Sequence, residues 1–205
     1  MGIPTKTSMP SSADAAGTVS SMLARDVKLV TPAARLCDSY RGLVAEFVDG
    51  GEKLVPFVLG FDHADFDAML ARLADCSRGI GLPDGFVAHS TYWLVEDQER
   101  VVGVSNVRHA LTPSLLREGG HIGYGIRPGA RGRGLGREIL RQSLRRAHDL
   151  GIADVLVTCG QANVASAKVI VGNGGALDSE VFVPDRDEIV QRYWIRRGAV
   201  ARPKG

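Results

Sequence analysis

The chain has 205 residues, a hydrophobic content of 44% and a formal net charge of +2. This length and composition predict one soluble globular domain, and no window approaches the roughly 20 apolar residues of a membrane span. The small net charge excludes the strongly basic surface that is typical of nucleic-acid binding. The three cysteines, Cys37, Cys76 and Cys159, form neither a metal-ligand spacing nor an even disulfide set, which indicates a reducing, cytoplasmic compartment.

Residues 1–25 are rich in Ser, Ala, Gly and Thr and have neither a basic start nor a continuous apolar run. They make a poor signal peptide, and we expect a flexible tail whose composition also permits a short helix near 13–24. We expect a single domain over 26–197 and a second loose end over 198–205.

The expected helices have apolar residues at three- and four-residue spacing, and the expected strands are short β-rich runs bounded by turn residues. The early strands form a hairpin and the later ones alternate with helices, which predicts an α/β (α+β) fold with a mixed central sheet of about six to seven strands flanked by helices. The expected elements are a strand at 27–30, helices at 33–48 and 64–76, strands at 91–95 and 101–107, a helical turn at 112–114, a strand at 120–127, a helix at 133–150, a strand at 154–159, a helix at 163–173, and strands at 176–183 and 189–196.

The most informative segment is 131–136, Arg-Gly-Arg-Gly-Leu-Gly, which joins an expected strand to an expected helix. A helix start presents unpaired N–H groups and a partial positive charge. Glycines let a ligand approach the main chain, and Arg131 and Arg133 add positive charge. The segment therefore predicts an anion-binding loop, most naturally for a phosphate or pyrophosphate.

Three phosphate-binding patterns compete for this loop. A Walker loop needs Gly-Lys-Ser/Thr, which is absent. A dinucleotide fingerprint needs a further glycine where Arg137 or Ile139 stands, and Asp154, at the distance of a ribose-binding acid, precedes its strand instead of ending it. The third pattern, Arg/Gln-x-x-Gly-x-Gly/Ala, is filled without a gap by residues 131–136.

A second pattern follows the expected strand at 154–159. Asn163-x-x-Ser166 begins a helix that ends at Gly174 and Gly175, and the asparagine and the glycines are also plausible helix caps. With both patterns in this order, the chain resembles the GNAT superfamily of acetyl-CoA-dependent N-acetyltransferases. The string 119–175 resembles a branch of predicted bacterial acetyltransferases whose substrates are not established, and the resemblance extends over roughly 27–196.

The resemblance implies an acyltransferase that moves an acetyl group from acetyl-CoA to a primary amine by direct attack on the thioester. The alternatives are a non-catalytic acyl-CoA binding or sensing module and a nucleotide-binding regulator. The resemblance also implies that strand 120–127 splays from strand 154–159 to admit the pantetheine arm, and no metal is expected. The implied cofactor contacts are Gly125, Ile126, Arg127, Arg131, Gly132, Arg133, Gly134, Leu135, Gly136, Arg137, Asn163, Ser166 and Lys168.

The catalytic residues are less evident. In the family a tyrosine about seven residues after the asparagine acts as general acid, but Ile170 stands there. The stand-ins are Tyr124, Cys159 and Tyr193. Histidine titrates near neutral pH, so we expect His121 to be the general base. Glu118, just before it, acts directly or through water. The predicted catalytic set is therefore His121, Tyr124 and Glu118.

The acceptor is not readable from the sequence. Antibiotic, polyamine, amino-acid and protein amines stay open, because the expected substrate walls at 49–62, 77–90 and 108–120 carry no motif. Arg108 and His109 either bind an acidic group on the acceptor or have a simple surface role. A homodimer through the closing strands would be compatible with the family. We expect no nucleic-acid or membrane partner.

Overall fold

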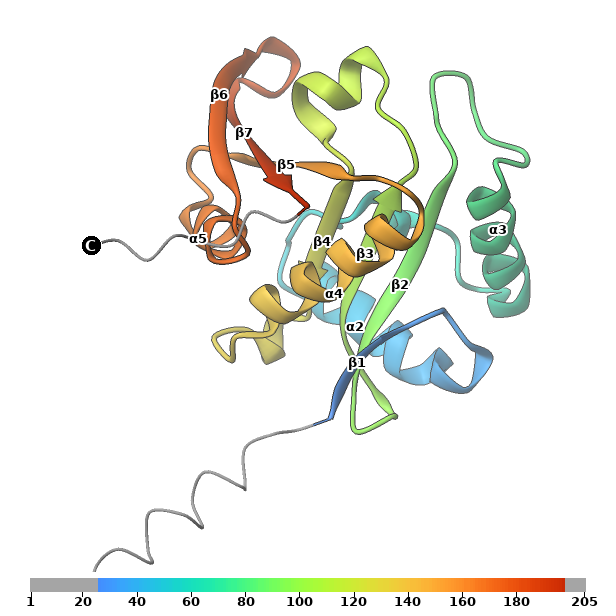
Figure 1. The fold of residues 1–205 in the computed structure, drawn as a ribbon. Coiled ribbons are helices and arrows are strands. Elements are labelled where there is room, and N and C mark those ends of the chain that lie inside the picture. Colours follow the sequence, from blue (N-terminus) through green and yellow to red (C-terminus); the bar gives the residue numbers. More distant parts are fainter. Residues whose placement is uncertain (1–25, 198–205) are drawn as a thin grey trace, which may run out of the picture.

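The computed structural model describes residues 26–197, so the expected tails and the helix considered near 13–24 lie outside the described residues. Figure 1 shows strands and helices in the order that the sequence predicts. The strands are β1 (Val27–Val30), β2 (His89–Glu96), β3 (Arg100–Arg108), β4 (Ile122–Ile126), β5 (Asp154–Gly160), β6 (Ala176–Val183) and β7 (Glu188–Arg196). The helices are α2 (Cys37–Asp49), α3 (Phe66–Arg78), α4 (Leu135–Asp149) and α5 (Val164–Gly172), with short turns between them.

The predicted α+β class is confirmed, and the described strands form two hydrogen-bonded sheets. The first has the order β1-β2-β3-β4 and the second the order β5-β7-β6, with antiparallel pairing in each. The break lies between β4 and β5, the two strands expected to splay. At one end of that break the His121 N–H donates to the Leu156 carbonyl at 2.7 Å, so the two strands meet at a point.

The two faces of the first sheet are covered by different helices. Adjacent residues on a strand point to opposite faces. Trp93 on β2 therefore stacks on Tyr40 of α2, with 4.6 Å between the ring centroids, whereas Leu94 packs with Ile139 of α4. Helices α2 and α3 cover one face, and α4 covers the other (Figure 1).

Helix α4 is apolar on two sides. Leu135 and Ile139 pack against the first sheet, whereas Leu140 and Leu144 join a cluster with Val157 of the second sheet. Burying a leucine or isoleucine side chain contributes roughly 1.5–3 kcal/mol, so this helix joins the sheets where their hydrogen bonding stops. The beginning of α4 consequently lies beside the gap between β4 and β5.

Glycines and caps set several boundaries that differ from the expected ones. Helix α4 begins at Leu135 and not at residue 133, because Gly134 has a left-handed φ of 77° that no helix continues. Helix α3 begins at Phe66, since the Asp65 carboxylate accepts the Ala68 N–H at 2.9 Å. Strand β4 begins at Ile122, because Gly120 has a φ of 64° that turns the chain into the junction with β5.

Two buried histidines are neutral in the folded protein. Burial, together with the nearby Arg108 charge, lowers the pKa of His89 and of His121 to about 4. In both rings Nδ1 accepts a hydrogen bond. His89 accepts from the Asn106 side-chain amide at 2.8 Å, and His121 accepts from the Leu156 N–H at 2.9 Å. Protonation of the His121 ring at Nδ1 would therefore break one of the two hydrogen bonds that join the sheets.

We expect the free energy of unfolding to fall as the pH drops from about 6.5 to about 4. The folded pKa lies below the unfolded value of 6.5, so the unfolded chain binds the proton first; a shift from 6.5 to about 4 corresponds to roughly 3 kcal/mol for each histidine. Urea unfolding at several pH values measures this free energy for the natural chain and for His121→Asn. The asparagine side-chain oxygen can accept the same Leu156 N–H but does not titrate. The variant should lose roughly half of the pH dependence that the histidines cause, and parallel pH profiles would contradict the assignment.

Candidate active site

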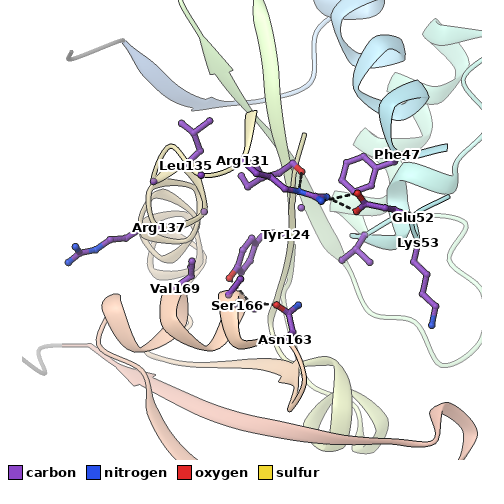
Figure 2. Close-up of a pocket in the computed structure, with 17 residues that line it drawn as sticks. Phe47, Glu52, Lys53, Tyr124, Arg131, Leu135, Arg137, Asn163, Ser166 and Val169 are labelled. Carbon is purple, nitrogen blue, oxygen red and sulfur yellow. Dashed lines mark hydrogen bonds and ion pairs between the residues drawn. The ribbon is translucent and has the colours of Figure 1, made fainter. Parts of the chain in front are cut away.

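A cavity of about 640 Å³ lies between the second half of β4, the start of α4, the start of α5 and the loop after α2. Figure 2 shows these four walls, with the Tyr124 ring at the centre. Most of the residues that the resemblance implies for acetyl-CoA share this cavity with Tyr124, which was predicted to be catalytic: Gly125, Ile126, Arg131, Gly132, Gly134, Leu135, Gly136, Arg137, Asn163 and Ser166. Phe47, Glu52, Lys53, Val55, Ala165 and Val169 complete the lining and carry no sequence signal of their own.

The loop before α4 presents main-chain N–H groups to this cavity. Gly132 and Gly134 both have a φ of 77°, and a Cβ on either would meet no atom within 4 Å. Within residues 26–197, the N–H groups of Gly132, Gly134, Leu135 and Gly136 have no hydrogen-bond acceptor. Unpaired N–H groups at a helix start bind anions, and the open space above these glycines leaves room for one.

Arg131 connects the anion-binding loop to the opposite wall. Its guanidinium donates to both carboxylate oxygens of Glu52, at 2.8 and 2.7 Å, and its Nε donates to the Ile126 carbonyl at 3.2 Å. The same guanidinium lies 5.5 Å from the centre of the Phe47 ring. The hydrogen bonds from Arg131 lower the pKa of Glu52, so the pair stays ionised at neutral pH.

Three implied cofactor contacts have side chains outside the cavity lining. Arg127 donates to the Glu46 carboxylate at 2.7 Å, and Arg133 forms an ion pair with the buried carboxylate of Glu96. Lys168 follows Ser166 on α5 but does not reach the lining. The side chains of the two arginines are thus engaged by carboxylates, a partly exposed one for Arg127 and a buried one for Arg133.

Two cations at the rim are available to an anionic ligand. Lys53 and Arg137 stand on opposite sides of the cavity (Figure 2). Within the part of the chain that the structure describes, neither has an ion-pair partner. Lys53 is a functional candidate that the sequence analysis missed, because it lies in the loop after α2 and outside every motif.

The start of α5 combines a helix cap with a polar contact to β4. The Asn163 side-chain oxygen accepts the Ser166 N–H at 3.0 Å, and the Ser166 hydroxyl lies 3.0 Å from the Tyr124 hydroxyl. Ile170, which occupies the usual tyrosine position, is completely buried in the core. The nearest replacement for that tyrosine is therefore on β4 and not on α5.

Tyr124 is the one stand-in for the general acid that lines the cavity within residues 26–197. Burial raises the pKa of Tyr124 to about 12, so the phenol stays protonated and can donate at any physiological pH. Cys159 lies behind it, and burial raises the pKa of this thiol as well. The Tyr193 hydroxyl donates to Gln191 at 2.7 Å and does not reach the lining.

His121 and Glu118, the predicted bases, lie at the β4–β5 junction and not in the cavity lining. The His121 Nδ1 accepts the Leu156 N–H, so the proton of the neutral ring is on Nε2 and neither nitrogen has a free lone pair. Glu118 is half-buried, and its carbonyl accepts from the Thr158 hydroxyl at 2.9 Å. Its carboxylate lies 3.4 Å from Arg117 and 4.0 Å from Arg186.

Comparisons with known proteins agree with this geometry. The family model described as the acetyltransferase (GNAT) domain matches residues 57–175, more than half of the chain. No curated protein matches the chain significantly in sequence. Within residues 26–197, no helix has both the length and the apolar character that a membrane crossing requires.

Several solved structures share the fold at low sequence identity. The ribosomal L7/L12 alpha-N-protein acetyltransferase RimL, in complex with coenzyme A, aligns with a TM-score of 0.63 and 16% identity over 87% of this chain and 98% of its own. RimJ from Mycobacterium smegmatis, in complex with a CoA disulfide, aligns with a TM-score of 0.63 and 16% identity over 86% of this chain and 84% of its own. The dodecameric spermidine N-acetyltransferase from Vibrio cholerae aligns with a TM-score of 0.57 and 13% identity over 87% of this chain and 98% of its own.

Proposed function

This chain belongs to the GNAT acetyltransferase family, and we propose that it transfers the acetyl group of acetyl-CoA to a primary amine. The observation that carries this proposal is the row of unpaired N–H groups at 132–136, which opens on a cavity lined by β4 and by the starts of α4 and α5. The row would bind a pyrophosphate, and the cavity beside β4 would take the pantetheine arm. The alternative, a module that binds acyl-CoA without turnover, is an outcome of the tests below.

We assign the donor contacts to the residues of the cavity wall. The N–H groups of residues 132–136 would bind the pyrophosphate, with Arg137 and Lys53 supplying charge at the rim. Asn163 and Ser166 would contact the pantetheine arm, together with the main chain of β4. Arg127 would contribute only through its main chain, and the side chains of Arg133 and Lys168 are left out.

The chemistry requires an amine nitrogen to attack the thioester carbonyl carbon, after which the carbon–sulfur bond breaks and the thiolate leaves. We assign Tyr124 as the donor to the departing sulfur, because it is protonated and lines the cavity. The Ser166 hydroxyl would orient the phenol through their 3.0 Å contact. A correctly placed donor stabilises the charge that develops on the leaving group.

The proton that leaves the amine needs an acceptor other than His121. With its lone pair occupied by the Leu156 N–H, His121 is better assigned as a positioning residue that fixes the narrow end of the gap. Glu118 keeps its proposed role as proton acceptor, acting directly or through water. Its half-buried carboxylate belongs to the same junction, where the Thr158 hydroxyl holds its carbonyl.

The cellular setting is also a proposal. We expect a bacterial, cytoplasmic enzyme without a nucleic-acid or membrane partner, and Cys37, Cys76 and Cys159 are free thiols in the structure, as a reducing compartment allows. A homodimer through the closing strands is supported by the exposed side chains of Leu177 and Phe182 on β6, which lies at a sheet edge.

Calorimetric titration with acetyl-CoA, with ATP and NAD as controls, tests the donor assignment. We expect selective binding of acetyl-CoA, and release of free thiol when an amine panel is added. A folded sample that binds no acetyl-CoA would refute the assignment. Tight binding without thiol release on any amine would favour the sensing module instead.

Gly134→Asn should weaken acetyl-CoA binding by about tenfold or more, because its side chain would occupy the open space above the unpaired N–H groups. Asparagine tolerates the left-handed conformation better than other residues, so the expected stability cost is only about 1 kcal/mol. The matched control is Gly81→Asn, which also has a positive φ and an unobstructed Cβ but lies far from the cavity lining. Calorimetry and thermal unfolding of both variants measure the difference. Equal affinities for the two variants would show that the anion site is elsewhere.

Tyr124→Phe should reduce kcat by roughly 10²–10⁴-fold while leaving acetyl-CoA binding nearly unchanged, because it removes a proton donor but keeps the ring. The control is Tyr92→Phe, a half-buried tyrosine on β2 outside the cavity lining. Steady-state assays across pH 6–9 should show no limb that belongs to Tyr124, since its pKa lies near 12. Unchanged kcat in Tyr124→Phe would exclude it as the donor.

A further inference from the structure

Arg108, at the end of β3, is a half-buried cation that the donor site does not use. Its NH1 atom donates to the carbonyls of Gly119 and Gly120, at 2.9 and 3.1 Å. Within residues 26–197, no carboxylate lies within 4.0 Å of its guanidinium nitrogens. Burial lowers the pKa of Arg108, which shows that this charge is poorly solvated, although an arginine stays protonated in proteins.

Glu118, the acid that precedes these carbonyls, pairs with Arg117 and Arg186 instead of with Arg108. His89 and His121 flank it, and both are neutral because their pKa lies near 4. The Phe57 ring centre is 5.9 Å from the guanidinium carbon. An isolated charge at a partly dry position is costly unless an anion pairs with it. A ligand anion would supply that pair.

The guanidinium lies beside β4. NH2 and NH1 are 3.6 and 3.8 Å from the position that a Cβ on Gly123 would occupy. Within residues 26–197, neither Nε nor NH2 has a hydrogen-bond partner, and neither is among the fully buried polar atoms without one, so both keep some exposure to solvent. Two or more donors of the planar group therefore remain for a carboxylate, which matches such a fork in geometry.

This position adjoins the acetyl-CoA cavity. Gly123 and Gly125 lie on the same face of β4, about 7 Å apart along the strand. Gly125 lines the cavity, and a Cβ there would overlap the carbonyl of Val55, which lines it too. Pro56 follows Val55 over Gly123, 3.5 Å from the corresponding Cβ position. Arg108 thus lies beside β4, one two-residue repeat further along the strand than the cavity lining at Gly125.

We infer that Arg108 recognises a carboxylate on the acceptor, so that the substrate is an amine that also carries an acid. This inference rests on the proposed acetyl transfer. Among the acceptors that the sequence leaves open, it favours amino acids and acidic peptides and disfavours polyamines, whose positive charges the unpaired Arg108 would repel. The histidines beside Arg108 are neutral, so the positive charge at this position is that of the arginine.

The test compares amines that differ only in the acid. Free amino acids, the matching amino-acid amides, peptides with an acidic second residue, and spermidine are assayed by thiol release from acetyl-CoA. For the acids, kcat/KM should exceed that of the uncharged partners by about tenfold to a hundredfold. The ranking of free amino acids against acidic peptides shows which source supplies the carboxylate. No preference for acids, or a preference for spermidine, would overturn the inference.

Arg108→Gln should reduce the acid-to-amide ratio to near one with an unchanged KM for acetyl-CoA, and Arg108→Lys should keep part of it. The matched control is Arg145→Gln, an exposed arginine on α4 outside the cavity lining. A purely structural Arg108 would lower turnover of acids and amides equally, and that result, or an equal loss of the ratio in Arg145→Gln, would refute the inference.

A binding measurement covers the case in which no amine is turned over. Thermal unfolding of the coenzyme A complex is recorded with each acid and with its amide. The acids should raise Tm more than the amides in the natural protein and not in Arg108→Gln. Equal shifts in both proteins would overturn the carboxylate assignment, whereas failure of coenzyme A itself to bind would be a failure of the proposed function.

Discussion

The site depends on one constraint: β4 and β5 are joined at a single point and part beyond it. Leu156 forms the join with both of its main-chain groups, through the His121 N–H and the His121 ring. If β4 and β5 were hydrogen-bonded along their whole length, the strands could not part. If they were not joined at all, nothing would fix their separation. Helix α4, buried against both sheets, supplies the packing energy that hydrogen bonds do not supply there.

The charges around the gap follow from this arrangement. The N-terminus of α4 brings unpaired N–H groups to the opening, and Arg131 connects that loop to Glu52 on the far wall. Arg127 reaches instead toward α2, where it satisfies Glu46. Some of the positive side chains thus support the walls of the cavity. Arg108 instead binds main-chain carbonyls and has no carboxylate partner within residues 26–197, which is why we assign it to the acceptor.

The parts of the site that could be predicted from the sequence are local ones. The loop at 131–136 and the Asn163–Ser166 pair are compact, because a turn and a helix cap are made by residues that are neighbours in the chain. The parts that could not be predicted depend on distant partners. Arg133 pairs with Glu96, 37 positions away, and Lys53 and Phe47 reach the cavity only because α2 packs beside β4. No periodicity or spacing reports such pairs.

Taken alone, the sequence determined the order and type of the elements, the glycine-rich loop before α4 and the family, because these depend on propensity, caps and short motifs. The tertiary structure decided how the candidate residues are used. His121 has the chemistry of a base, yet its ring nitrogen accepts the N–H of Leu156 on β5, while the Tyr124 hydroxyl meets Ser166, which packing brings to it from another element. A side chain's protonation and lone pairs depend on burial and on its partners, and only the packed chain sets both.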